Sequence, residues 1–86
     1  MSNIWSLIGI TLLFLGKPDK AILAFKRQIE VTPSHEQAWY GIGEAFSLLG
    51  KPDEAIAAYQ KQIEITPNHK RALSGLKGLN DALSNW

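Results

Sequence analysis

The 86-residue chain contains no cysteine, so disulfide bridges, Cys-based zinc sites and thiol chemistry are excluded. Long hydrophobic runs are also missing. The most apolar stretch, IWSLIGITLLFL at 4–15, has 12 residues, whereas a membrane-spanning helix needs about 20. It lacks the preceding basic residues and the following small-residue cleavage site of a secretory signal. We therefore expect a buried helix here, no membrane association and a cytoplasmic location.

An excess of charge of either sign is absent as well. Nine Lys and Arg residues against eight Asp and Glu residues give a net charge of +1, and acids are interleaved with the bases, so no nucleic-acid surface is predicted. The sequence has no nucleophile motif, HExxH helix or glycine-rich phosphate loop. We expect no enzymatic activity, no cofactor and no metal.

The sequence does contain an internal repeat with a period of 34 residues. LGKPDKAI at 15–22 returns as LGKPDEAI at 49–56, and 17 of 34 positions are identical between 2–35 and 36–69. Self-similarity at a fixed period of this length is typical of stacked repeat proteins. The chain is therefore predicted to be a single domain, 1–86, made of two repeats (2–35 and 36–69) and a last segment (70–86).

Each repeat is predicted to form two helices joined by a tight turn. In the second repeat, Ser34 and Gln37 fit an N-terminal capping box, and Gly50 fits a helix stop in the left-handed conformation. Pro52 suits the first turn of the next helix, and Pro67 disfavours helix at the residue before it. One apolar stripe with spacings of three and four is formed by Trp39, Ile42, Phe46 and Leu49.

Two glycines are placed in the middle of predicted helices. Gly9 and Gly43 each cost about 1 kcal/mol relative to Ala at such positions. This cost indicates that a neighbouring helix approaches closely there. We expect Ala21 and Ala55 to provide the matching shallow surface, with the rings of Phe25 and Tyr59 further along.

This arrangement resembles the tetratricopeptide repeat family. The residues that carry the resemblance are Trp39, Ile42, Gly43, Phe46, Gly50, Ala55, Tyr59 and Pro67, with Trp5, Ile8, Gly9, Leu12, Gly16, Ala21, Phe25 and Pro33 in the first repeat. The resemblance implies an all-α fold of about five helices, in which helical hairpins stack into a right-handed superhelix. Gln28 and Gln62 depart from the Ala that is usual in the family. Segment 70–86 is similar to the first helix of a third repeat, and Lys77 in place of Gly43 predicts a capping helix.

The resemblance also implies a protein–protein interaction module with a concave groove lined by the first helix of each repeat. The candidate partner-binding residues that follow from it are Leu7, Ile10, Leu13, Phe14, Tyr40, Glu44, Leu48 and Arg71. One subclass of the family grips a peptide carboxylate with basic and amide side chains, but only Arg71 is of a suitable type here. We therefore expect a protein or peptide partner with an apolar segment, such as an amphipathic helix.

The helix predicted at 4–15 is unusual because nine of its twelve residues are large and apolar. Trp5, Ile8, Leu12 and Leu15 are expected to face the second helix of the same repeat and the second repeat. A further face, formed by Leu7, Ile10, Leu13 and Phe14, is left for an interface. It could mediate self-association, as a dimer or by exchange of helices, pack under a further helix of a longer repeat array, or bind a different partner. The alternative function is a purely structural homo-oligomerisation unit.

His35 and His69 occupy the same column of the two repeats. Stacked repeats would hold them about 10 Å apart, too far to share a metal ion. We expect both to be solvated turn residues.

Overall fold

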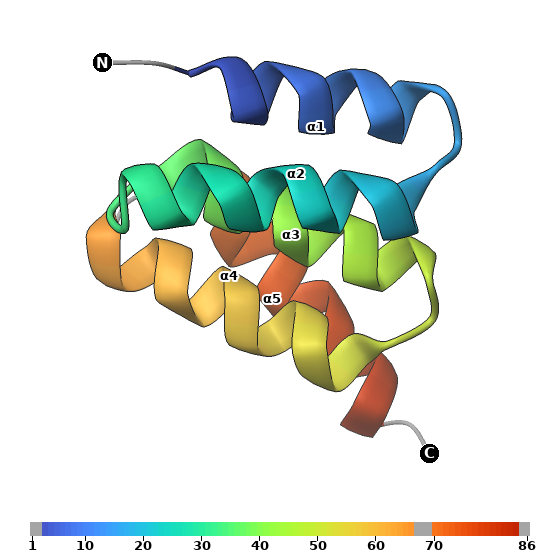
Figure 1. Ribbon diagram of the computed structural model, residues 1–86. Helices are drawn as coiled ribbons and strands as arrows, with labels where there is room; N and C mark the ends of the chain where they lie inside the picture. The colour runs from blue at the N-terminus through green and yellow to red at the C-terminus, as the bar shows by residue number, and fades with distance from the viewer. Residues whose placement is uncertain (1–2, 67–69, 85–86) are drawn as a thin grey trace.

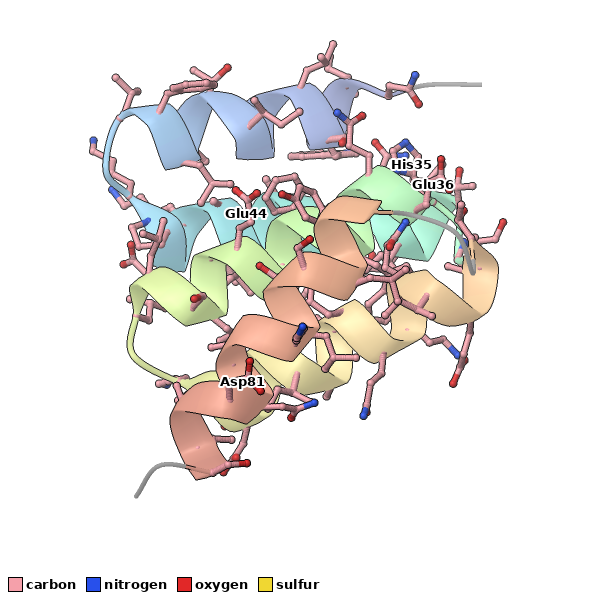
Figure 2. The ribbon with its side chains drawn as sticks, turned by 180° about the vertical axis from the view of Figure 1, so that it is seen from behind. His35, Glu36, Glu44 and Asp81 are labelled. Carbon is pink, nitrogen blue, oxygen red and sulfur yellow. The ribbon has the colours of Figure 1, made fainter. Side chains whose placement is uncertain are left out.

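The computed structural model describes residues 3–66 and 70–84, and this part of the chain is entirely helical apart from its turns. Its helices are α1 (Ile4–Phe14), α2 (Pro18–Val31), α3 (Glu36–Leu48), α4 (Pro52–Ile65) and α5 (Lys70–Ser84). The helices α1 and α2 form one hairpin, α3 and α4 form a second, and α5 packs against the second (Figure 1). Helices α2 and α4 lie in front of α3 and α5 in Figure 1, and the view from behind brings α5 forward (Figure 2). The all-α prediction of five helices is confirmed.

The two hairpin turns are built in the same way because they share the sequence LGKPD. Gly16 and Gly50 have φ angles of +73° and +71°, a region that glycine adopts without the steric cost of a Cβ. The N–H of Lys17 then bonds to the carbonyl of Leu12 at 2.9 Å, which satisfies a carbonyl at the end of α1. Proline follows at once as the first residue of α2 and of α4. The predicted stops and starts at these turns are confirmed.

The start of α3 differs from the predicted capping box. The N-cap is His35, whose Nδ1 accepts the backbone N–H of Ala38 at 3.2 Å. Because Nδ1 accepts, the proton lies on Nε2, which donates to Asn3 Oδ1 at 3.0 Å. His35 lies at a helix end, as expected, and is half-buried. It also joins the start of α1 to the start of α3 (Figure 2), a capping role that the prediction does not include. His69 lies outside the described residues.

Two aromatic rings fill the space beside the helix glycines. The ring of Phe25 is fully buried, and a Cβ added at Gly9 or Gly41 would lie 2.6 or 2.4 Å from it. The ring of Tyr59 lies in the same way against Gly43 and Gly75, at 2.7 and 3.0 Å. The predicted close approach is thus made by a ring. The glycines make room for these rings and not for the expected alanines, although Ala21 and Ala55 are fully buried in the core.

The buried glutamines sit in equivalent positions but have different surroundings. Gln28 is fully buried, and its Oε1 accepts the N–H of Ser6 at 3.0 Å. This bond satisfies one of the N–H groups that a helix start leaves without a partner. Gln62 is also fully buried, but neither of its amide atoms has a hydrogen-bond partner among the described residues.

Helices α1 and α5 lie at the two ends of the stack, and the packing of α1 differs from the prediction. In α5, Leu76 and Leu79 pack against the buried pair Ala55 and Tyr59, while Lys77 is exposed; that 70–86 is a capping helix stays a prediction. In α1, however, the expected buried stripe is wrong, because Leu15 is 64% exposed and Trp5 and Ile8 are exposed as well. Their counterparts on α3 are covered by α2, whereas in the described residues α1 packs only on α2 and α3.

Candidate partner-binding groove

A hollow of about 350 Å³ lies between α1 and α3, on the side of the molecule that Figure 2 shows. We call it the concave groove. It is lined by Ile10, Leu13, Phe14, Phe25, Gln37, Tyr40, Gly41, Glu44 and Leu48. Both helices contribute, and because α1 and α3 end in the same glycine turn, the equivalent residues Phe14 and Leu48 both line the groove.

The structure brings together six of the eight predicted partner-binding residues in this groove: Ile10, Leu13, Phe14, Tyr40, Glu44 and Leu48. Leu7 is 61% exposed and lies outside the groove lining. Arg71 belongs to α5, but its side chain lies outside the described residues. Phe25, on the groove floor, is missing from the predicted residues. Gly9 and Gly41, which leave room for its ring on either side, are the sequence signal that points to it.

The apolar residues of the groove form a floor and two rims. Ile10 and Leu13 are half-buried and pack on the core. Phe14 and Leu48 are 87% and 67% exposed, respectively, and occupy equivalent last positions of α1 and α3. Large apolar side chains that are this exposed and line the same hollow are typical of a surface that binds something.

Among the described residues that line the groove, Glu44 is the only acidic or basic one. It is half-buried and lies in the part of α3 framed by α1 above and α5 below in Figure 2. Tyr40, nearby in the lining, stacks obliquely on Tyr59, with ring centroids 5.8 Å apart. Burial raises the pKa of Tyr59 to about 12, helped by the negative charge of Glu44 and by Tyr40. The described lining of the groove therefore combines an apolar floor with one negative charge.

Other kinds of site are not apparent in the described part of the chain. Residues 3–66 and 70–84 contain no cluster of three or more His, Cys, Asp or Glu side chains that could hold a metal ion. Within the same ranges, none of the helices combines the length and the apolar character that crossing a bilayer requires.

The comparisons with known proteins agree with this geometry. The tetratricopeptide repeat family model matches residues 7–70, which is most of the chain. The chain belongs to the tetratricopeptide repeat family. Domains of this family are generally protein-interaction modules and typically have no catalytic activity. The resemblance predicted from the sequence is confirmed.

Solved structures extend the similarity of this tetratricopeptide repeat chain. A crystal structure of MamA has a TM-score of 0.90 and 26% sequence identity, and the match covers 93% of this chain and 47% of that one. A second MamA crystal structure has a TM-score of 0.83 and 29% identity, with 94% and 48% covered. This chain therefore spans about half the length of those proteins. A comparison with curated protein sequences found no match.

Proposed function

We propose that the chain binds a short apolar segment of a partner protein in the concave groove. The observation that carries this proposal is the pair of exposed side chains, Phe14 and Leu48, above the half-buried floor of Ile10 and Leu13. Closing a segment over these residues removes apolar surface from water, which is the main driving force for association. No chemical step is part of this function.

The chemistry of the groove defines the segment that fits it. Apolar residues at helical spacing match the floor and the two rims. A Lys or Arg among them matches Glu44, because a half-buried carboxylate loses part of its hydration when the groove closes, and the described lining of the groove holds no basic side chain beside it. We propose an amphipathic segment with one basic residue as the partner, recognised without a clamp on its terminal carboxylate.

This function can be tested with a library of displayed helical peptides selected on the full chain. Enriched peptides are expected to carry apolar residues with one Lys or Arg. Leu48→Glu should abolish their binding, because it places a charge on the rim. The matched control is Val31→Glu on α2, since Val31 is 56% exposed and lies outside the groove.

Two results would contradict this proposal. One is the absence of any enriched apolar sequence. The other is an equal loss of binding on Val31→Glu and Leu48→Glu. The role of the acid is checked separately, because Glu44→Gln should remove the preference for a basic residue while leaving apolar binding in place.

A second candidate is that the partner is another copy of this chain, bound through α1. Two observations favour it: α1 has no charged side chain over Ile4–Phe14, and Phe14 is almost fully exposed. A two-fold contact or an exchange of α1 between copies would cover that ring. Light scattering over a hundredfold range of concentration tests this. A dimer that is lost in the Leu13→Glu, Phe14→Glu double variant supports the candidate, and a monomer throughout rejects it.

A further inference from the structure

A second hollow lies on the other side of α1, between α1 and α2. Its volume is about 540 Å³, and we call it the outer groove. Its apolar residues are Trp5, Ile8, Leu12, Leu23 and Ala24, and its charged rim is formed by Lys20, Lys26, Arg27 and Glu30. It shares no lining residue with the concave groove. The outer groove is therefore a separate surface.

The second hairpin contains the same hollow 34 residues further along the chain. There it is lined by Trp39, Ile42, Phe46, Glu54, Ala57, Ala58 and Lys61, and also by Lys26 and Ile29 of α2. Helix α2, which belongs to the first hairpin, thus lies along the hollow of the second hairpin. The chain itself shows that a surface of this shape packs against an α-helix. The outer groove repeats that shape on α1 and α2, where no other described helix is packed.

The first difference between the two hollows is their charge. The rim of the outer groove has three basic residues and one acid, whereas the equivalent positions Glu54, Gln60, Lys61 and Glu64 have one basic residue and two acids. In the second hairpin, Lys26 of the packed helix lines the same hollow as Glu54. Lys20 takes the place of Glu54 in the outer groove. A helix in the outer groove therefore requires an acid where α2 has Lys26.

The second difference is the size of one side chain. On α3, Gly41 admits the ring of Phe25, which a Cβ there would meet at 2.4 Å. The equivalent residue on α1 is Leu7, which is exposed. A helix that approaches α1 as α2 approaches α3 therefore requires a small residue where α2 has Phe25. Because α2 and α4 have Phe25 and Tyr59 at this position, the second helices of another copy do not fit.

We propose that the outer groove binds an amphipathic helix of a different protein. This helix has a small residue at the position of Phe25, an acid at that of Lys26, and a branched apolar residue at that of Ile29. The partner helix is thus small where α2 has the large ring of Phe25, and negatively charged where α2 has the positive charge of Lys26. The interaction is independent of the concave groove, so the chain has two binding surfaces on opposite sides of α1.

The test uses a stapled peptide with the sequence of residues 18–31 carrying Phe25→Ala and Lys26→Glu, and circular dichroism first confirms that it is helical. Fluorescence anisotropy should show saturable binding of the labelled peptide to the full chain. The peptide that keeps Phe25 should bind about tenfold more weakly, because its ring meets Leu7. The peptide that keeps Lys26 should bind about fivefold more weakly, as expected for one exposed charge pair.

Protein variants locate the binding site. Leu23→Glu should abolish binding of the stapled peptide, whereas Leu48→Glu, equally exposed but in the concave groove, should leave it unchanged. Lys20→Glu should reverse the order of the two charges, so that the peptide with Lys26 binds more tightly than the peptide with Glu. Each variant substitutes an exposed side chain, and circular dichroism checks that its fold is kept.

Three results would overturn the proposal. The first is no saturable binding of a peptide shown to be helical. The second is an unchanged charge preference in Lys20→Glu, which would mean that the peptide lies elsewhere. The third is a dimer in light scattering that Leu23→Glu converts to a monomer, which would mean that a second copy occupies the outer groove. Because the variants of the two grooves are separate, failure here leaves the test of the concave groove intact.

Discussion

The first and second hairpins have the same residue at 17 of 34 aligned positions, yet only the second has helices packed on both sides. Helix α2 covers α3 and helix α5 covers α4, whereas the first hairpin packs on the second alone. Ile42 is consequently buried in the core, while its counterpart Ile8 is exposed. Identical residues therefore become core or binding surface according to the neighbour they meet.

The largest expected effect comes from exchanging one residue between the hairpins. Gly41→Leu places on α3 the residue that α1 has at the equivalent Leu7, and its side chain would overlap the buried ring of Phe25. We expect a loss of about 3 kcal/mol or more in the free energy of unfolding, measured by urea denaturation.

The reverse exchange is the matched control. Leu7→Gly removes an exposed side chain, so it should cost only the helix propensity of about 1 kcal/mol. If both variants lost the same free energy of unfolding, the packing of the Phe25 ring would not require a glycine at position 41.

The buried glutamines provide the next comparison. Gln28→Met removes the acceptor for the N–H of Ser6, so this buried donor is left without a partner, at a cost of about 1–3 kcal/mol. Gln62→Met replaces an amide whose atoms have no partner in the described structure by an unbranched thioether of similar shape. We expect this second variant to be about 1 kcal/mol more stable than the unmodified chain in the same urea titration.

The decisive result is that Gln28→Met lowers the free energy of unfolding whereas Gln62→Met raises it. If both variants lose stability by similar amounts, Gln62 has a partner of its own, such as a buried water molecule. If neither changes, the bond from Ser6 to Gln28 contributes nothing to stability.

The comparison also shows what sequence reasoning could reach. The period, the glycine turns and the helix-starting prolines predicted both hairpins, because these signals depend on local backbone geometry. The partner of Gly9 was not predicted, because a period gives no information on which side chain points across the hairpin. Trp5 and Ile8 were expected to be covered, because their pattern is identical to that of Trp39 and Ile42 and sequence alone does not show where the packed helices stop.

Six candidate residues come together in the concave groove for a related reason. The family resemblance gives the face of each first helix, and Tyr40 and Glu44 follow from it directly. The outer groove could not be anticipated, since it depends on how α1 lies against α2 and on the absence of another described helix over them. The cap at His35 was also missed, because Ser34 is the better capping residue by type and only the structure shows that the side chain of His35 caps α3, which starts at Glu36.

A smaller effect is expected at this cap, which only the α3 hairpin has. His35→Ala removes the acceptor for the N–H of Ala38 and the bond to Asn3, so about 1 kcal/mol of stability should be lost. His35→Asn restores an N-cap side chain and should recover most of this loss in thermal unfolding. If Asn recovers nothing, the contact with Asn3 is what matters, and Asn3→Ala should then reproduce the full effect.

The smallest expected effect concerns the two aromatic rings, since Tyr59 has a phenol where Phe25 has none. The native pKa of about 12 lies above the ordinary value of 10.0. The stability that neutral Tyr59 contributes is therefore complete below pH 10 and is lost as the pH rises toward 12. In a Tyr40→Phe background, absorbance near 295 nm should follow the ionisation of Tyr59 alone. Glu44→Gln should lower its midpoint by about half a pH unit, as expected for one charge several ångström away. A titration midpoint near pH 10 in either protein would show that the ring of Tyr59 is open to water and is not buried as the ring of Phe25 is.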